Sequence, residues 1–133
     1  MEKVNLEKLL QTNLLPLAFI GDGVHTLFVR EHCLRNGALK LENYHIEASS
    51  YCKASSQAAA LEGIMPILNE EELNIVRRAR NAKPKHHAKN ASSGDYSHAT
   101  AFEALIGFLY LKEDKARLEE ILLLSLNSNQ KKS

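Results

Sequence analysis

The sequence predicts an all-α fold, and three observations support this prediction. Apolar residues recur at intervals of three and four over most of the chain, as they do along one face of a helix. No segment of strand length alternates apolar and polar residues. Asn, Pro and Gly stand where this spacing stops, as is typical of helix ends. A chain of 133 residues has the size of one domain. We expect this domain to span residues 1–126, with a polar, disordered tail at 127–133.

The first predicted helix covers about residues 14–35 and stops near Asn36-Gly37. Its apolar positions are Ile20, Val24, Leu27, Phe28 and Leu34. Gly21 and Gly23 lie inside it, and each glycine destabilises a helix by about 1 kcal/mol relative to Ala. We therefore expect a partner helix or a substrate phosphate to approach the backbone closely here.

A second helix is predicted over about residues 43–68, with Pro66 bending or ending it. Small residues along it permit close helix packing; they are Ala48, Ala54, Ala58 and Ala59. A third helix is predicted to begin at Asn69, because Asn is a favoured cap and Glu72 stands in the capping-box position. Its apolar residues Leu73, Ile75 and Val76 lead into a run of arginines.

Two more helices complete the predicted bundle. The apolar positions of the first are Phe102, Leu105, Ile106 and Leu109. The last helix begins near Asp114 and carries Leu118, Ile121, Leu122 and Leu124.

Asp22 and Glu103 are single acids within otherwise apolar helical stretches. An ionised carboxylate on a core-facing surface is costly unless a cation or a hydrogen-bond network accepts it. A divalent cation shared by the two acids is one explanation, because magnesium prefers carboxylate oxygens. Two surface acids at helix edges are the alternative, since spacing alone does not show whether the two segments meet.

Two residue runs resemble the catalytic domain of the ribonuclease III family. They are Phe19-Ile20-Gly21-Asp22-Gly23-Val24 and, about eighty residues later, Phe102-Glu103-Ala104-Leu105-Ile106-Gly107. Three further runs resemble the short Mini-III subfamily, namely Leu15-Pro16-Leu17-Ala18, Arg77-Arg78-Ala79-Arg80-Asn81-Ala82-Lys83 and Tyr96-Ser97-His98-Ala99-Thr100-Ala101-Phe102-Glu103. The resemblance covers about residues 14–112 and implies a ribonuclease III endonuclease-like helical bundle.

The resemblance implies that Asp22 and Glu103 are catalytic acids that hold Mg²⁺, for which Mn²⁺ is a substitute. Longer relatives bring four acids to each centre, whereas this chain has Leu15, Ala18 and Thr100 at three acidic positions of the family pattern. Mini-III sequences share this reduced set, which leaves a second metal with few ligands. The expected reaction is hydrolysis of a phosphodiester bond in double-stranded RNA, with 5′-phosphate products.

The resemblance also implies a homodimer that places two centres across the RNA duplex. Phe19 matches the aromatic residue that packs into the partner subunit of relatives. A buried core residue is the alternative role for Phe19.

Basic residues are concentrated in one part of the chain. Residues 73–94 contain six of the 17 basic residues and none of the 16 acidic ones, although the net charge of the whole chain is only +1. Such a segment can neutralise RNA phosphates. The predicted RNA-binding residues are Arg77, Arg78, Arg80, Asn81, Lys83, Lys85, His86, His87 and Lys89. The alternative is that these residues form a basic helix face that only contacts solvent. The resemblance to Mini-III relatives implies that the loop of about residues 84–93 contacts the RNA groove.

The other histidines and the two cysteines are not expected to take part in catalysis. A zinc site formed by His86, His87, His98 and Asp95 is disfavoured, because their spacing matches no usual ligand pattern. We expect packing or surface roles for His25, His32 and His45. Cys33 and Cys52 are expected to be free and at least half-buried, since their spacing fits no metal or redox motif.

The family implies maturation of the 23S ribosomal RNA precursor, with a large-subunit ribosomal protein as a further partner. A chain of this length is too short to add a double-stranded-RNA-binding domain, and it has no secretion or membrane signal, so we expect a cytoplasmic enzyme. A non-catalytic RNA-binding or ribosome-assembly protein with the same fold is the main alternative. A purely structural helical interaction domain is a third, but it leaves the basic segment without a role.

Overall fold

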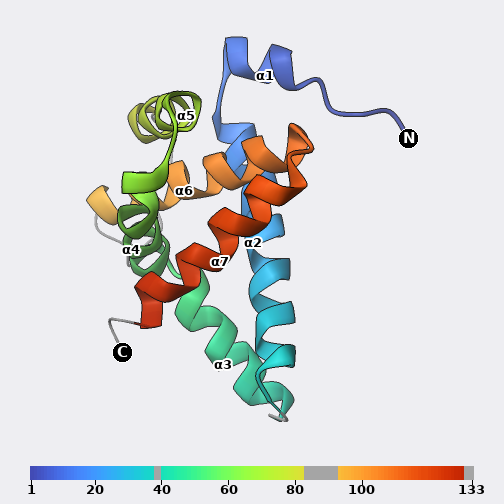
Figure 1. The fold of residues 1–133 in the computed structure, drawn as a ribbon, viewed down its shortest axis with the longest axis vertical. Coiled ribbons are helices and arrows are strands. Elements are labelled where there is room, and N and C mark those ends of the chain that lie inside the picture. Colours follow the sequence, from blue (N-terminus) through green and yellow to red (C-terminus); the bar gives the residue numbers. More distant parts are fainter. Residues whose placement is uncertain (38–39, 83–92, 131–133) are drawn as a thin grey trace.

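The computed structural model describes residues 1–37, 40–82 and 93–130. Over these ranges the chain forms α-helices and one short 3-10 helix, without strands, which confirms the all-α prediction (Figure 1). The elements are α1 (Leu6–Thr12), α2 (Leu15–Arg35), α3 (Leu41–Cys52), α4 (Ala54–Ile64), η1 (Met65–Ile67), α5 (Glu70–Asn81), α6 (Ser93–Leu111) and α7 (Lys115–Gln130).

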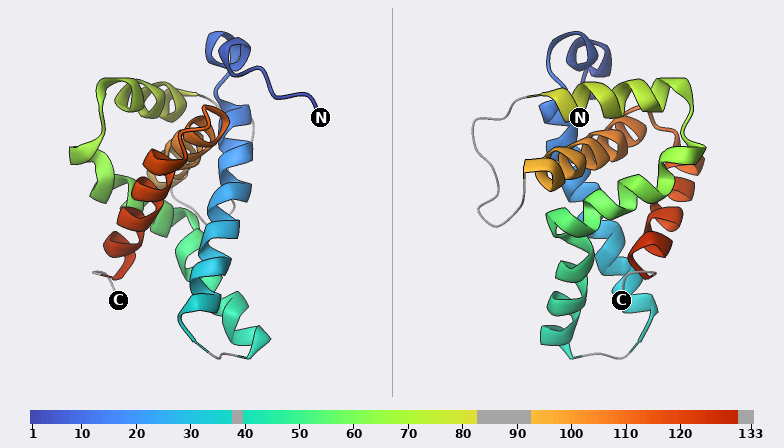
Figure 2. Two further views of the ribbon diagram at one scale, coloured as in Figure 1. Left: turned by 45° about the vertical axis from the view of Figure 1, so that its right-hand side comes forward. Right: turned by 90° about the vertical axis from the view of Figure 1, so that its left-hand side faces the viewer.

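The long helix α2 forms one side of the molecule, and α6 crosses it (Figures 1 and 2). Pro16 lies in the first turn of α2, where the missing amide hydrogen costs nothing. The Asn13 side chain accepts a hydrogen bond from the Leu15 amide at 3.0 Å. The helix ends at Asn36, so the predicted first helix is confirmed within one residue.

The prediction of one continuous helix over residues 43–68 is wrong. The chain breaks at Lys53, whose φ of −67° and ψ of 156° are extended, so that α3 and α4 are separate helices. The Ser56 hydroxyl donates to the Ser50 carbonyl across the break. Neither Gly nor Pro stands at Lys53, so the sequence contains no residue that would predict a break there. Pro66 lies in η1 directly after α4, as expected of a residue that ends the helix.

The capping box at the start of α5 is confirmed. Asn69 accepts a hydrogen bond from the Glu72 amide at 2.8 Å, and the Asn69 amide donates to Glu72 Oε1 at 3.0 Å. The Glu72 side chain also receives two hydrogen bonds from Arg117 of α7, at 2.6 and 2.8 Å. One buried carboxylate therefore caps α5 and fixes α5 to α7.

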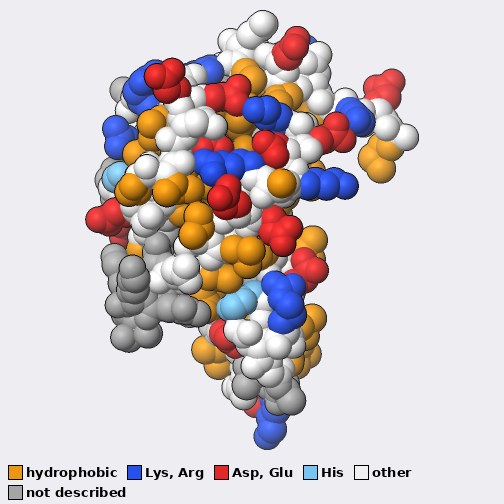
Figure 3. All heavy atoms as spheres, in the orientation of Figure 1, with side chains coloured by type: hydrophobic (Ala, Val, Ile, Leu, Met, Phe, Trp, Pro, Cys, Tyr) orange, Lys and Arg blue, Asp and Glu red, His pale blue; other side chains and the backbone are white. Residues whose placement is uncertain are grey.

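The face of the molecule seen in Figure 3 mixes charged side chains of both signs with hydrophobic ones. Among the described residues, no helix is long and apolar enough to cross a membrane. The helix α7 continues to Gln130, beyond residue 126 where the sequence predicts the domain to end, and residues 131–133 lie outside the described part. The sequence reasoning missed α1, which begins at Asn5, whose side chain accepts from the Lys8 amide.

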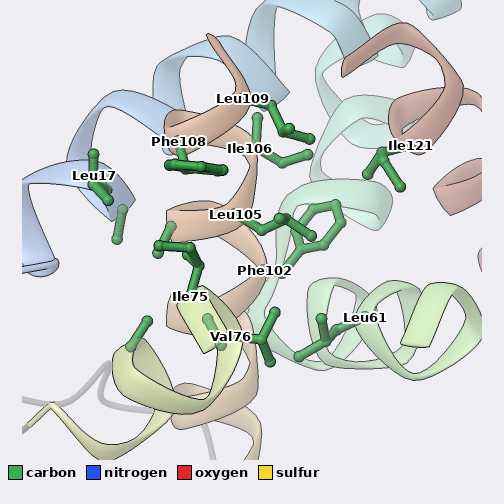
Figure 4. Packing of buried hydrophobic residues seen from close by; sticks show 14 of the residues in the cluster. Leu17, Leu61, Ile75, Val76, Phe102, Leu105, Ile106, Phe108, Leu109 and Ile121 are labelled. Carbon is green, nitrogen blue, oxygen red and sulfur yellow. The ribbon is translucent and has the colours of Figure 1, made fainter. Parts of the chain in front are cut away.

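The hydrophobic core surrounds α6, which contributes residues to several sides of the bundle (Figure 4). Phe102, Leu105, Ile106, Phe108 and Leu109 of α6 are each at most 2% exposed. They pack with buried residues from α2, α4, α5 and α7, which include Leu17, Leu61, Ile75, Val76 and Ile121. Because buried residues of four other helices pack against α6, the position of Glu103 on this helix is set by packing.

Candidate active site

The site begins at a close crossing of α2 and α6. A Cβ atom at Gly21 would lie 1.7 Å from the Glu103 carbonyl oxygen, and one at Gly107 would lie 2.0 Å from the Leu17 carbonyl oxygen. Only glycine fits at either position, since real Cβ contacts are essentially never that short. The expected close approach at Gly21 is therefore that of a partner helix, whereas a Cβ at Gly23 would meet nothing within 4 Å.

This crossing brings Asp22 and Glu103 together. Asp22 is exposed and Glu103 is half-buried, and the two side chains are close enough for Asp22 to affect the ionisation of Glu103. Burial, followed by the hydrogen bond and the negative charge of Asp22, raises the pKa of Glu103 to about 9. At neutral pH the pair without a cation therefore holds a proton on Glu103.

Two buried residues that the sequence reasoning did not assign to the site extend it inward. Gln57 of α4 is 3% exposed, and its Nε2 lies 3.4 Å from Glu103 Oε2 and 3.1 Å from His25 Nδ1. The His25 and Phe102 rings pack in a T-shaped arrangement, with 5.0 Å between the ring centroids. Burial lowers the pKa of His25 to about 4, against the opposing charge of Asp22, so the imidazole is neutral. The packing role expected for His25 is confirmed, but His25 also contacts the site through Gln57.

Asp22 and Glu103 suit a hard divalent cation. Each supplies carboxylate oxygens, and a cation between them would replace the proton that the raised pKa of Glu103 retains. The side chains at the three other acidic positions of the family pattern supply no carboxylate. Ala18 is buried, Leu15 is half-buried and apolar, and the Thr100 hydroxyl donates to the Tyr96 carbonyl of its own helix at 2.9 Å.

Four of the predicted RNA-binding residues fall within the described part of the chain, and they lie near the end of α5. Arg77, Arg78, Arg80 and Asn81 are all exposed. Arg77 donates to Asn74 of the same helix at 2.7 Å, while Arg78 donates to the Leu10 carbonyl and so holds α1 against α5. Lys83, Lys85, His86, His87 and Lys89 lie outside the described residues, as does most of the loop of residues 84–93.

A groove of about 300 Å³ lies between α4, α5 and the start of α6. Its polar lining residues include Glu62, Arg80, Asp95 and His98. Over the described residues, no three His, Cys, Asp or Glu side chains come together as a metal site would require, and this part of the chain gives no support to the zinc alternative. His98 instead contacts the Gly94 carbonyl of its own helix through Nδ1, at 2.7 Å.

Phe19 is 80% exposed, so its alternative role as a buried core residue is wrong. Leu27 and Leu34 lie on the same helix and are 61% and 64% exposed. Helical spacing places these residues, together with Gly23, on one outer face of α2, which also carries the exposed Arg30. The outer face of α2 consists of Phe19, Gly23, Leu27, Arg30 and Leu34.

The remaining residues behave as the sequence predicts. Cys33 is a free, buried thiol and Cys52 a free, half-buried one. The His32 ring packs on the edge of Tyr51, with 5.6 Å between the ring centroids, and His45 is exposed.

Comparison with known proteins identifies the family of this chain. A model of the Ribonuclease III domain family matches residues 15–114. The chain is 50% identical to the Mini-ribonuclease 3 of Brevibacillus brevis over 111 residues, covering 84% of this chain and 83% of the relative. It is 39% identical to the Mini-ribonuclease 3 of Clostridium tetani over 133 residues, covering 99% of this chain and 88% of the relative.

The fold is also similar to a crystal structure of a protein from Fusobacterium nucleatum. The TM-score is 0.79 at 28% sequence identity, and the match covers 87% of this chain and 93% of the other. Residues 15–114, which the family model matches, contain Asp22 and Glu103 and the glycines that bring their helices together. The chain therefore belongs to the ribonuclease III family, and within it to the Mini-ribonuclease 3 group.

Proposed function

We propose that this protein is a magnesium-dependent endoribonuclease that hydrolyses phosphodiester bonds in double-stranded RNA and leaves 5′-phosphate ends. Membership of the ribonuclease III family supports the class of enzyme and of substrate. The observation that carries the proposal is the meeting of Asp22 and Glu103 at the crossing of α2 and α6.

In this proposal Asp22 and Glu103 hold the cation, and Mn²⁺ can replace Mg²⁺. A divalent cation supplies water at a lowered pKa and offsets the charge that develops on the phosphate. Exposed Asp22 faces solvent, from which RNA arrives, whereas Glu103 is held by the packed helix α6. The chain thus offers one accessible carboxylate and one rigid carboxylate, a combination suited to a fixed centre that a large substrate can reach.

The end of α5 is the proposed site of RNA binding. Arg77, Arg80 and Asn81 are exposed there and precede the basic residues 83–89. Such contacts with phosphates are independent of base sequence, and double-stranded RNA is read mainly by shape across its minor groove. We therefore propose weak sequence preference and strong salt dependence for RNA binding.

We further propose a homodimer formed through the outer face of α2. One centre cuts one strand, so two centres related by a two-fold axis are needed for a double-strand cut. An exposed Phe19 beside an open Gly23 is suited to entering a second subunit. The proposed physiological substrate is the stem of the 23S ribosomal RNA precursor, with a large-subunit ribosomal protein as a further partner.

Two carboxylates meet at this site in the described part of the chain, and this small number supports a second function, that of a non-catalytic RNA-binding or assembly protein. The test is to incubate the protein with end-labelled duplex and single-stranded RNA, with and without magnesium at low salt. We expect cleavage of the duplex alone, only with magnesium, and products whose 5′ ends are labelled by kinase only after phosphatase treatment. Intact duplex that is bound and shifted on a gel would favour the non-catalytic function.

A further inference from the structure

Gln57 is a buried amide in direct contact with a proposed metal-holding residue. It comes from α4, whereas Asp22 and Glu103 come from α2 and α6, so it adds a third helix to the site. Its neighbours in sequence are Ser56 and Ala58. A Gln among small residues that is 3% exposed needs hydrogen-bond partners, and it has them in His25 and Glu103.

The amide nitrogen of Gln57 faces both of its partners in the structure. The His25 imidazole is 1% exposed and packs on Phe102, an environment that favours the neutral ring. In this arrangement Nδ1 is the unprotonated nitrogen of the neutral ring and accepts one hydrogen bond, and Glu103 Oε2 accepts the other. The amide nitrogen of Gln57 has two hydrogens, one for each acceptor, at 3.1 and 3.4 Å. The bond to His25 therefore accompanies an amide nitrogen that faces Glu103.

We propose that Gln57 is a positioning residue that holds the Glu103 carboxylate toward Asp22, and that His25 in turn holds Gln57. This inference rests on the proposed function, because it concerns the same metal site. Glu103 Oε2 points to the Gln57 nitrogen, which restricts rotation of a side chain that otherwise has free torsions. A carboxylate held in this way is ready to bind a cation without first losing conformational freedom.

The test is to replace Gln57 by Met, which keeps the unbranched length of the side chain and removes both donors. Mn²⁺ is titrated into the full chain without RNA, and free Mn²⁺ is followed by electron paramagnetic resonance. Loss of a residue that orients a metal ligand typically weakens metal binding by about 10–100-fold. We expect a dissociation constant raised by that factor, and the same shift in the magnesium concentration for half-maximal RNA cleavage.

Controls separate positioning from a general effect on the fold. Ser56→Ala changes the neighbouring buried residue of α4, whose hydroxyl bonds Ser50 and not the site, and it should leave Mn²⁺ affinity unchanged. Gln57→Asn keeps an amide but withdraws its nitrogen by one methylene, and it should weaken Mn²⁺ binding in the same direction. If Gln57→Met does not fold, the Mn²⁺ affinity of Gln57→Asn tests whether Gln57 positions Glu103.

The outcomes distinguish this inference from the proposed function. A wild-type protein that neither binds Mn²⁺ nor cuts duplex RNA would overturn the proposed function and this inference with it. A wild-type protein that binds Mn²⁺, beside Gln57 variants whose affinity stays within twofold, would overturn only the inference. Gln57 variants with a lowered melting temperature and unchanged Mn²⁺ affinity would also overturn only the inference, because Gln57 would then act on the fold alone.

Discussion

The backbone of Gly21 lies so close to Glu103 that a Cβ atom there would stand 1.7 Å from the Glu103 carbonyl oxygen. This contact sets the separation of α2 and α6, and Asp22 follows Gly21 directly on α2. The same contact that packs the helices therefore also places the two carboxylates side by side. The stability of the fold and the geometry of the proposed metal site therefore depend on the same helix crossing.

Replacing Gly21 by Ala should destabilise the protein strongly. The added methyl group meets rigid backbone, so the helices must separate, and we expect a loss of about 3 kcal/mol or more in the free energy of unfolding. Urea denaturation followed by circular dichroism measures this loss. Gly23→Ala is the matched control, because its methyl group meets nothing within 4 Å and Ala favours a helix by about 1 kcal/mol. Equal stability of the two variants would contradict the importance of the crossing.

The stability of the metal-free protein should fall as the pH rises from 6.5 to 8. Glu103 is protonated in the folded protein, with a pKa of about 9, but ionised in the unfolded chain, where its pKa is near 4.5. The unfolded state therefore binds fewer protons, and stability decreases by up to about 1.4 kcal/mol per pH unit. This contribution is complete below pH 4.5 and is lost as the pH rises through about 9. His25, with a pKa lowered to about 4, acts in the opposite direction but only below pH 6.5.

Glu103→Gln is the control for this pH dependence, because its amide does not titrate. Its melting temperature in chelator should be nearly constant between pH 6.5 and 8 and higher than that of the wild type at pH 8. An equally steep decline in both proteins would assign the effect to other groups. The upper limit of pH 8 avoids the Cys33 and Cys52 thiols, whose pKa values burial raises above the ordinary 9.0.

Arg117→Leu should destabilise the protein by leaving the Glu72 carboxylate buried without a cation. The Glu72 side chain is 1% exposed, and Arg117 holds the pKa of this carboxyl below its usual range. Removing one partner of such a pair costs about 3–5 kcal/mol. Thermal denaturation at pH 7 measures the change, and the double variant Arg117→Leu with Glu72→Gln should recover part of it. A loss below about 0.5 kcal/mol would show that α5 needs no such attachment.

Phe19→Ala should weaken the proposed dimer without destabilising the monomer. The side chain is 80% exposed in the monomer, so truncation creates no cavity there, while removal of a central aromatic from an interface typically costs 2 kcal/mol or about 30-fold in affinity. Sedimentation equilibrium measures the dissociation constant. Tyr110→Ala removes another exposed aromatic, one on α6 at 51% exposure, and should have no effect. Unchanged association of the Phe19 variant would exclude this face of α2 from the interface.

Local signals in the sequence predict much of this fold. The capping box at Asn69 and the stop at Asn36 depend on neighbouring residues, and both are confirmed. The break at Lys53 is not marked by Gly or Pro, and the helix boundary there depends on how α3 and α4 pack. Tertiary packing overrides the local spacing at that point.

The sequence likewise predicts some features of the candidate site, while others depend on contacts between distant segments. Two helical glycines indicate a close approach in the sequence, but only the crossing with α6 distinguishes Gly21, which needs it, from Gly23, which faces open space. Gln57 carries no signal of its own, because a single Gln in a helix is ordinary until its partners are known. His25 and Glu103 are those partners, and they lie 32 and 46 residues away in the sequence.

The most direct test of the shared cation at Asp22 and Glu103 is a magnesium titration of duplex RNA cleavage under single-turnover conditions. Wild type, Asp22→Asn and Glu103→Gln are compared, with duplex binding in chelator as the control for RNA affinity. We predict saturable, magnesium-dependent cleavage by the wild type and a loss of at least 100-fold in both variants, with RNA binding retained. Cleavage that persists in either variant at the wild-type magnesium requirement would contradict a metal held by this pair.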